Sequence, residues 1–581
     1  MNSAKQQFAF RRLIIAGLFL LAVCALLWRA FDLHISSQVF LQKQGDARHI
    51  RTVEISAHRG NIYDRNGEPL AISTPVDSVW INPKQITGSL DQLPELSKLL
   101  AIETESLQKR LIANASREFM YVKRRVQPSV AEQVKKLAVE GVYLQREYQR
   151  FYPTGEVSAH VLGFTNVDDE GQEGIELAYN EFLAGKSGAK KIIRDRLGRA
   201  VDDVERISSA EPGQDLTISI DRRLQYLAYR ALKSAMKTHK AKSASAVVLD
   251  VKTGEVLAMV NQPSYNPNDR ADLNPSRTRN RAVTDLFEPG SAIKPITMIA
   301  ALDSGKWKSS DAVSTSPGYM KVNHNTIKDV RNFGDLSLPA VIYKSSNVGI
   351  SKIALSLSKE QQWHIYRQFG LGQTTGSGFP GEVAGHFDFY KNVTDFERAT
   401  LSFGYGMSVT PLLLTRAYAA IANHGVINPV SFLKLNEKAE GKSVSSSVIA
   451  ADVIRMMETT VSSKGTGIRA AVNNYRVAGK TGTIHKSKAG GYEDDSYQSV
   501  FAGFAPLSDP RLAMVVMVNE PSAGEYYGGQ VAAPVFSNVM MNAMRLLDIA
   551  PDKLNIGNQL SDKKQRKRVS VLSDVKNGGR V

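Results

Sequence analysis

The sequence predicts an α+β protein in which one antiparallel sheet is covered by helices, preceded by an elongated mixed domain and a single N-terminal transmembrane helix. Three observations support this prediction. An uninterrupted apolar run occupies residues 13–28. Residues 38–215 mix short strand-like runs with polar helices. From residue 216 onward, strand patterns stand at both ends of a long, largely helical stretch, which favours one sheet covered by helices.

The overall composition sets broad limits on the class of protein. The 581 residues suffice for two or three domains, and a hydrophobic fraction of 43% is ordinary for a globular chain. The net charge of +16 is compatible with an anionic membrane or polymer as partner, whereas no basic stripe interleaved with aromatic residues indicates nucleic acid. The ten histidines show no close pair with ligand spacing, so we expect no metal site and no cofactor.

The N-terminal apolar run is predicted to anchor the chain in a membrane. The uninterrupted part is shorter than the roughly 20 residues of a spanning helix. Further apolar residues extend it, and we therefore place the transmembrane helix at residues 13–35. Lys5, Arg11 and Arg12 precede it with no acidic residue among them. By the positive-inside rule, residues 1–12 are expected in the cytoplasm and the rest of the chain on the far side of the membrane.

Two other interpretations of this run stay open. A cleaved signal peptide would need small residues around the cleavage point, and Trp28-Arg29-Ala30 fits that need poorly. A lipoprotein site would use Cys24, but Val23 before it is larger than the small residue usual there. Cys24 is the single cysteine of the chain, so no intramolecular disulfide is possible, which fits an exported domain.

Residues 38–215 are interpreted as a non-catalytic domain, which we call the pedestal. Polar helices are expected at residues 92–100 and 129–139. No pair of a nucleophile and a base stands out in the pedestal, so a second enzymatic domain is the less favoured alternative.

Residues 216–547 are predicted to form the sheet-and-helix domain. A turn at residues 252–254 joins two strands into a hairpin, and helices follow to about residue 461. The expected strands are residues 216–220, 244–250, 255–260, 475–478, 499–504 and 512–518, with a helix at residues 223–236.

The chain ends in a polar segment. Residues 563–568 form a basic run, and glycines follow it. We expect residues 548–581 to be a basic disordered tail.

The first candidate catalytic element is Ser291 followed three residues later by Lys294. Ser-x-x-Lys recurs elsewhere in the chain, but here Pro289-Gly290 makes a turn and a buried helix follows. Pro295 is tolerated only in a first helical turn, which puts the helix start at or near Ser291. Residues three apart share a helix face, so Lys294 is expected beside the Ser291 hydroxyl, at the positive end of the helix dipole.

Two further elements follow in the order that a serine acyl-transfer enzyme with a lysine base requires. Ser345 and Asn347 place a hydroxyl and an amide where they can relay a proton and hold a substrate amide. Lys480 adds a positive charge that helps keep a neighbouring lysine neutral and binds a carboxylate. Gly482, between Thr481 and Thr483, lets the backbone and a substrate approach closely.

These three motifs resemble those of the penicillin-binding proteins and serine β-lactamases, and other segments narrow the resemblance to the class B penicillin-binding proteins. Four segments resemble motifs of the class B pedestal, namely residues 59–67, 150–155, 160–164 and 174–180. Five more resemble the septal transpeptidases of this class, namely residues 280–285, 369–372, 378–382, 518–521 and 526–529.

The resemblance implies the penicillin-binding-protein transpeptidase fold and a role for each motif. Ser291 would attack a peptide that ends in D-Ala-D-Ala, and Lys294, made neutral by burial and by Lys480, would take its proton. Ser345 would protonate the leaving D-alanine, and Asn347 would hold the side-chain amide of the donor peptide. The backbone N–H groups of Ser291 and Thr483 would form the oxyanion hole, and the hydroxyls of Thr481 and Thr483 would bind the substrate carboxylate.

The implied function is D,D-transpeptidation of peptidoglycan stem peptides during septal cell-wall synthesis, with β-lactam antibiotics as inhibitors that acylate the same serine. The implied location is the inner membrane, with the catalytic domain in the periplasm. The implied partners are an FtsW-like glycosyltransferase and other division proteins. Two alternatives stay open: a hydrolase, either a D,D-carboxypeptidase or a β-lactamase, and a catalytically silent scaffold or β-lactam sensor.

Overall fold

The computed structural model describes residues 2–40, 50–86, 90–194, 200–438, 440–488 and 491–553. These residues fall into two compact units. The first unit lies within Met1–Arg59, Ser73–Gln149 and Ala184–Gln214, and the second within Gly60–Ile72, Arg150–Leu183 and Asp215–Val581. Most of the tail predicted to be disordered, from residue 554 on, lies outside the described residues.

The chain begins with a long helix, α1 (Asn2–Phe31), which continues into a π-helical turn, η1 (Asp32–Ser36). Within the described residues, the segment Phe10–Ser36 is long and apolar enough to cross a membrane, with a mean hydropathy of 2.4. Near its end, Arg29 Nη1 donates to Asp32 Oδ2 at 2.8 Å. Because opposite charges lower each other's cost in an apolar setting, this pair makes the end of the run compatible with a membrane interface.

The first unit contains a three-stranded antiparallel sheet and a small helical core. Strand β6 lies between β1 and β7 in the sheet. The core joins apolar residues of three helices to those of two strands, among them Val79, Leu96, Leu107 and Val134. The predicted helices at 92–100 and 129–139 are present here as α3 and α5. The elements are β1 (Ile50–Ile55), β3 (Pro69–Ile81), α3 (Leu93–Leu99), α4 (Thr104–Ala113), β4 (Met120–Val126), α5 (Pro128–Leu137), β5 (Val142–Phe151), β6 (Gly188–Arg194) and β7 (Ala200–Ser208).

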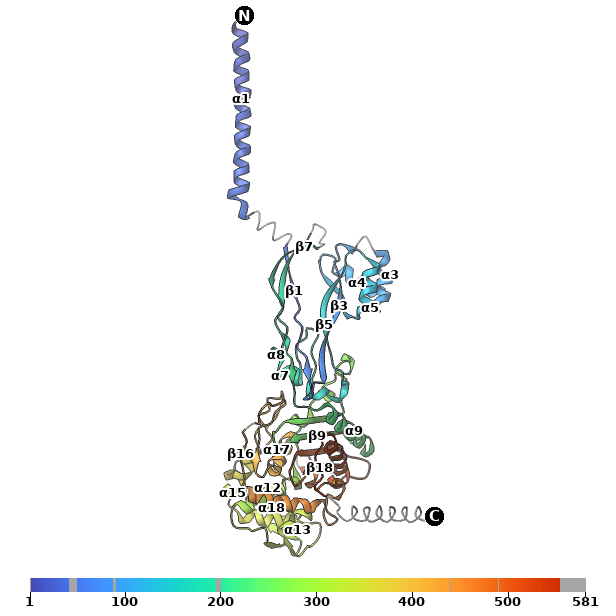
Figure 1. Ribbon diagram of the computed structural model, residues 1–581, viewed down its shortest axis with the longest axis vertical. Helices are drawn as coiled ribbons and strands as arrows, with labels where there is room; N and C mark the ends of the chain where they lie inside the picture. The colour runs from blue at the N-terminus through green and yellow to red at the C-terminus, as the bar shows by residue number, and fades with distance from the viewer. Residues whose placement is uncertain are drawn as a thin grey trace, which may run out of the picture. The chain divides into compact units, whose positions relative to one another are not determined.

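The second unit is built on a five-stranded antiparallel sheet of order β10-β9-β19-β18-β17. The bounds are β9 (Ser243–Asp250), β10 (Val256–Gln262), β17 (Ala478–Lys488), β18 (Gly491–Ala505) and β19 (Leu512–Asn519). Figure 1 shows the green strand β9 and the red strand β18 in the same sheet, although they are far apart in the sequence. The predicted hairpin at 252–254 and the predicted strands at 499–504 and 512–518 are therefore confirmed.

Two predicted strands differ from the structure. The run at 216–220 forms only the short β8 (Leu216–Thr217), which pairs in parallel with β2 (Ile62–Tyr63) outside the five-stranded sheet. Alternation of apolar residues indicates a strand but not its partner, which here lies about 150 positions earlier. The strand expected at 475–478 begins only at its last residue, and β17 instead runs through the whole Lys480–Thr483 motif.

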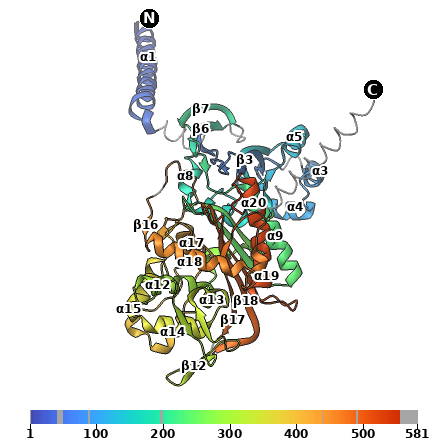
Figure 2. The same cartoon turned by 60° about the horizontal axis from the view of Figure 1, so that its bottom comes forward.

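Helices cover both faces of this sheet. Figure 2 shows α9 (Arg222–His239) and α20 (Ala533–Leu546) on one side, and α17 (Pro411–Ala422) and α18 (Ser447–Glu458) on the other. Ala246 and Val248 belong to the core cluster under α9 and α20, whereas Val247 and Leu249 belong to the cluster under α17. Every residue of β9 is buried, as a strand covered on both faces requires. The predicted α+β fold is thus present as a sheet between two helical layers.

The remaining elements of the second unit surround the sheet. The helices are α6 (Ala159–Leu162), α7 (Gly174–Ala178), α8 (Asn180–Ala184), α10 (Pro275–Thr278), α11 (Arg281–Thr284), α12 (Lys294–Asp303), α13 (Leu338–Tyr343), α14 (Asn347–Ser356), α15 (Lys359–Gln368), α16 (Asp395–Leu401) and α19 (Gly528–Val531). The short strand pairs are β11 (Ala312–Ser314) with β14 (Asp335–Ser337), β12 (Tyr319–Val322) with β13 (Asn325–Lys328), and β15 (Val426–Ile427) with β16 (Lys442–Ser443).

Two of the pedestal-like motifs meet in a buried ion pair of the second unit. Arg150 Nε donates to Glu176 Oε1 at 2.6 Å, and Arg150 Nη1 donates to the Gly60 carbonyl oxygen at 2.7 Å. Both charged side chains are almost completely buried. Breaking such a pair by removing one partner leaves an uncompensated buried charge, so these motif residues serve the fold rather than the chemistry.

Candidate active site

Ser291 lies in a tight turn, η6 (Gly290–Ile293), immediately before α12. The sequence places the helix start at or near Ser291, but the α-helix begins three residues later. Pro295 explains the difference: it has no N–H to donate to the Ser291 carbonyl four residues back, and the N–H of Lys294 donates to that carbonyl in a 3₁₀ pattern instead. A hydrogen bond to a distant segment also holds the turn: the Gly290 N–H donates to the Gly404 carbonyl oxygen at 3.1 Å.

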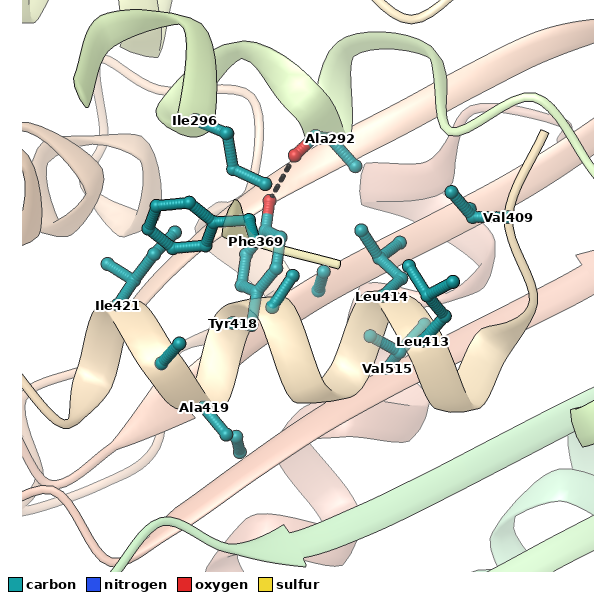
Figure 3. Packing of buried hydrophobic residues seen from close by; sticks show 14 of the residues in the cluster. Ala292, Ile296, Phe369, Val409, Leu413, Leu414, Tyr418, Ala419, Ile421 and Val515 are labelled. Carbon is teal, nitrogen blue, oxygen red and sulfur yellow. Dashed lines mark hydrogen bonds between the residues drawn. The ribbon is translucent and has the colours of Figure 1, made fainter. Parts of the chain in front are cut away.

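Helix α17 supports this turn from below through a single buried hydroxyl. The Tyr418 hydroxyl donates to the Ala292 carbonyl oxygen at 2.7 Å, in the residue directly after Ser291 (Figure 3). Burial raises the pKa of Tyr418 well above its usual value, so the hydroxyl remains a proton donor. Ile296, Phe369, Leu413, Leu414 and Val515 belong to the same buried apolar cluster as Tyr418 (Figure 3).

Ser345 lies between α13 and α14 and connects the predicted catalytic groups. Its hydroxyl donates to Ser291 Oγ at 2.9 Å. The same oxygen accepts from Lys480 Nζ at 3.0 Å and from Lys294 Nζ at 3.2 Å. Ser345 has a left-handed backbone, with φ of +60°, which is uncommon for a residue with a side chain and typical of functional positions.

Lys294 is completely buried, and its closest partners are oxygens that can only accept. Its Nζ lies 2.6 Å from the Ser345 carbonyl oxygen and 2.8 Å from Asn347 Oδ1. Burial, and then the charge of Lys480, lower the pKa of Lys294 well below its usual value, and Asp329 opposes the shift. Lys294 was expected beside the Ser291 hydroxyl; in the structure the link between the two runs through Ser345.

Asp329 fixes the start of α14, on which Asn347 lies, and it was not found from the sequence. Its Oδ1 accepts from the backbone N–H of Asn347 at 2.5 Å and of Val348 at 3.0 Å. Its Oδ2 accepts from the Ser346 hydroxyl at 2.5 Å. No motif or spacing marks Asp329, because the contacts span 17 to 19 residues and depend on the loop after β13.

The Lys480–Thr483 motif lies on β17, the edge strand of the sheet. Lys480 is completely buried, which lowers its pKa to about 7. The Thr481 hydroxyl lies 2.8 Å from the Thr466 hydroxyl, and the Thr483 hydroxyl accepts from the Gly528 N–H at 2.9 Å.

Gly482 lies where β17 approaches the turn that carries Ser291. A Cβ at this position would meet the Pro289 carbonyl oxygen at 3.0 Å. The approach expected at Gly482 was that of a substrate; the structure instead shows a close approach between β17 and the turn that carries Ser291.

These groups surround an open cavity of about 670 Å³. Ser291, Ser345, Asn347, Thr481 and Thr483 line it, while the two lysine amines lie behind this surface. Other lining residues include Lys328, Val330, Phe333, Lys344, Thr466, Arg469 and Tyr527. Among the described residues, no group of three or more His, Cys, Asp or Glu side chains is placed to hold a metal ion. The cavity therefore presents a serine hydroxyl backed by two desolvated amines, the arrangement of an acyl-transfer site.

Comparisons with known proteins show the family of the chain. Residues 244–541 match the penicillin binding protein transpeptidase domain, and residues 54–218 match the penicillin-binding protein dimerisation domain. The chain is 42% identical over 556 residues to the peptidoglycan D,D-transpeptidase FtsI of Escherichia coli K12, covering 95% of this chain and 94% of that protein. It is 39% identical over 549 residues to the probable peptidoglycan D,D-transpeptidase PenA of Neisseria meningitidis serogroup A, covering 94% and 93%.

Solved structures show the same relationship. The transpeptidase domain of penicillin-binding protein 3 from Burkholderia pseudomallei is 42% identical with a TM-score of 0.54, and covers 58% of this chain and 97% of that one. Penicillin-binding protein 3 from Mycobacterium tuberculosis, in complex with aztreonam, is 27% identical with a TM-score of 0.67, over 86% and 98% of the two chains. The chain therefore belongs to the penicillin-binding protein transpeptidases. Among them it is similar along nearly its whole length to FtsI, which confirms the resemblance predicted from the sequence.

Proposed function

We propose that this chain is a serine-type peptidoglycan D,D-transpeptidase that cross-links stem peptides during septal wall synthesis. The observation that carries the proposal is the Ser345 hydroxyl, which joins Ser291 to two buried lysine amines. A serine hydroxyl is a weak nucleophile, and a base of lowered pKa within proton-transfer reach is what activates it.

The contacts of Lys294 indicate the path of the proton. A neutral amine has two N–H groups and one lone pair. The two nearest partners, the Ser345 carbonyl and Asn347 Oδ1, accept only and so take two N–H groups. In the protonated amine the third N–H donates to Ser345 Oγ; in the neutral amine the lone pair takes that place and can accept the Ser345 proton. For the relay both hydroxyls turn from the arrangement in the structure, so that Ser291 donates to Ser345 Oγ and Ser345 donates to neutral Lys294. When Ser291 Oγ then attacks the penultimate carbonyl of the donor peptide, its proton passes to Ser345 Oγ, and the proton of Ser345 passes to Lys294.

The remaining roles follow from β17 and α14. The backbone N–H groups of Ser291 and Thr483 stabilise the oxyanion, an effect worth about 3–4 kcal/mol per donor. Lys480 and the hydroxyls of Thr481 and Thr483 attract the terminal carboxylate. Asn347 Oδ1 is occupied by Lys294, so its Nδ2, which lies 3.5 Å from the Lys328 carbonyl, is the half of the amide that binds the donor.

The acyl-enzyme then forms and is resolved in two balanced steps. Lys294 returns its proton through Ser345 to the nitrogen of the leaving D-alanine, as the C–N bond breaks. The amine of a neighbouring peptide attacks the Ser291 ester, loses a proton along the same route, and leaves a new peptide bond with the Ser291 hydroxyl restored.

The location and partners belong to the same proposal. We place residues 1–12 in the cytoplasm, residues 13–35 in the inner membrane, and both the pedestal at residues 38–215 and the transpeptidase domain at residues 216–547 in the periplasm. An FtsW-like glycosyltransferase would supply the glycan strands, and other division proteins would dock on the pedestal. β-Lactams, which resemble the D-Ala-D-Ala end, would acylate Ser291.

The intact mass of the detergent-solubilised full chain, followed for hours after penicillin is added, tests this proposal. A stable adduct of one drug molecule that is absent from Ser291→Ala is the expected result. An adduct that decays within minutes would favour a hydrolase, and the absence of any adduct would favour a silent scaffold. Lys294→Ala should abolish rapid acylation; near-native acylation of that variant would exclude Lys294 as the base.

A further inference from the structure

The cavity wall beside Ser345 carries two lysines that no carboxylate of the described residues neutralises. Lys328, at the end of β13, and Lys344, at the end of α13, both line the cavity. Among the described residues, no carboxylate oxygen lies within ion-pair distance of either amine. The third cationic residue that lines the cavity, Arg469, is paired with Glu525 at 3.1 Å.

Asp329 is the carboxylate among the described residues that line this wall, and its oxygens are already hydrogen-bonded. Both oxygens of Asp329 accept hydrogen bonds at the start of α14, from two backbone N–H groups and the Ser346 hydroxyl. The Lys344 amine lies over the aromatic ring of Phe333, 5.2 Å from the ring centroid. A cation–π contact positions an amine without cancelling its charge. The ring contact therefore gives the Lys344 amine no compensating carboxylate, and the Arg331 guanidinium, 5.3 Å from the centroid of the same ring, adds a second cation.

The two lysines lie next to the residues that, in the proposed function, bind the donor peptide. Lys344 directly precedes Ser345, and the Lys328 carbonyl oxygen is the neighbour of Asn347 Nδ2. The terminal carboxylate of the donor has its own partners on β17, so it does not account for these charges. Upstream of the D-alanyl pair, a stem peptide carries a carboxylate on its γ-linked glutamate, and a second one where its third residue is a diamino dicarboxylic acid.

We propose that Lys328 and Lys344 form a second carboxylate subsite, which binds a carboxylate of the donor peptide upstream of its D-alanyl pair. This inference rests on the proposed function and adds to it a determinant of donor choice. A charge-assisted hydrogen bond in a partly enclosed cavity favours the charged ligand over a neutral amide by about tenfold or more.

The test compares three synthetic pentapeptides on the full chain in detergent micelles. One has both upstream carboxylates free, one is amidated on the glutamate, and one is amidated on the third residue. The readout is the peptide concentration that halves the rate at which a fluorescent penicillin acylates Ser291, because it reports donor binding without requiring turnover.

The wild-type chain should need about tenfold more of one amidated peptide than of the free peptide, and that peptide identifies which carboxylate is bound. In the double variant Lys328→Gln/Lys344→Gln the ratio should fall below about twofold, whereas the double arginine variant, which keeps both charges, should retain it. Lys321→Gln, on the neighbouring strand β12 and outside the cavity lining, removes the same charge and should also retain the ratio.

Equal half-inhibitory concentrations for all three peptides on the wild-type chain would overturn the inference. So would a preference that persists in the double glutamine variant, or a failure of all three peptides to slow acylation. The loss of the penicillin adduct itself, in the wild-type chain, is a different result and would overturn the proposed function.

Discussion

Replacement of Ser345 by alanine removes the hydroxyl through which Ser291 and the two lysines are connected. Three hydrogen bonds are lost, at 2.9 Å to Ser291, 3.0 Å to Lys480 and 3.2 Å to Lys294. The fold should tolerate the change, because alanine and serine meet the same backbone strain at φ of +60°. Lys294 also keeps its two closest partners, the backbone carbonyl of residue 345 and Asn347 Oδ1.

The expected loss is therefore catalytic. A positioned proton-transfer group contributes about 10²–10⁴ in rate, and in the proposed relay Ser345 delivers the Ser291 proton to Lys294. The second-order rate constant for acylation by a fluorescent penicillin, measured by stopped flow, should fall by about two to four orders of magnitude in Ser345→Ala.

The adjacent Ser346 provides a matched control. Its hydroxyl accepts from the Gly349 N–H at 2.9 Å and donates to Asp329, so it caps α14 and takes no part in the proton path. Ser346→Ala should lower the free energy of unfolding by about 1–2 kcal/mol and slow acylation by less than about tenfold. If Ser345→Ala acylates within about tenfold of wild type, the Ser291 proton reaches Lys294 without Ser345, and the relay is wrong.

Further substitutions test two contacts near Ser291 and one buried histidine elsewhere in the second unit. Tyr418→Phe leaves a buried carbonyl beside the nucleophile without its donor and should lower the free energy of unfolding by about 1–3 kcal/mol, measured by urea denaturation. Gly404→Ala puts a Cβ 2.2 Å from the Gly290 carbonyl oxygen and should slow acylation. Gly406→Ala is the control: Gly406 also has a positive φ, but its Cβ would have its nearest neighbour at 4.0 Å, so this variant should slow acylation much less. Burial lowers the pKa of His160 to about 4, so the unfolded chain takes up a proton first as the pH falls. The free energy of unfolding should then drop between about pH 6.5 and pH 4 by up to about 3 kcal/mol, and His160→Gln should flatten that dependence. An unchanged pH dependence in His160→Gln would contradict the assignment of this loss to His160.

The sequence predicts the members of the site better than their connections. Ser291, Ser345, Asn347, Thr481 and Thr483 line one cavity, as three motifs in a fixed order indicate. Residue types and their order are enough to predict these members, because each motif forms its own turn, helix start or strand.

The supporting contacts could not be predicted in the same way. Tyr418 meets the turn after Ser291 across 126 residues, and Asp329 reaches α14 from a loop with no motif of its own. In the sequence, nothing distinguishes Gly404 from other loop glycines; only the packing of the Gly290 backbone against it requires a glycine. Each of these contacts depends on how distant segments pack, and local pattern carries no information about that.

The dependence of acylation on pH tests the central claim most directly, namely that a desolvated, neutral Lys294 activates Ser291 through Ser345. The rate constant for acylation of the full chain by penicillin would be measured between about pH 5 and pH 10. Because burial and Lys480 lower the pKa of Lys294, the rate constant should already be high near neutral pH and should fall on the acid side, as Lys294 gains a proton. It should also fall on the alkaline side from about pH 7, as Lys480 loses the charge that attracts the carboxylate. A rate constant that instead rises about tenfold per pH unit from neutral pH toward pH 10 would mean that the base is an ordinary, solvated lysine.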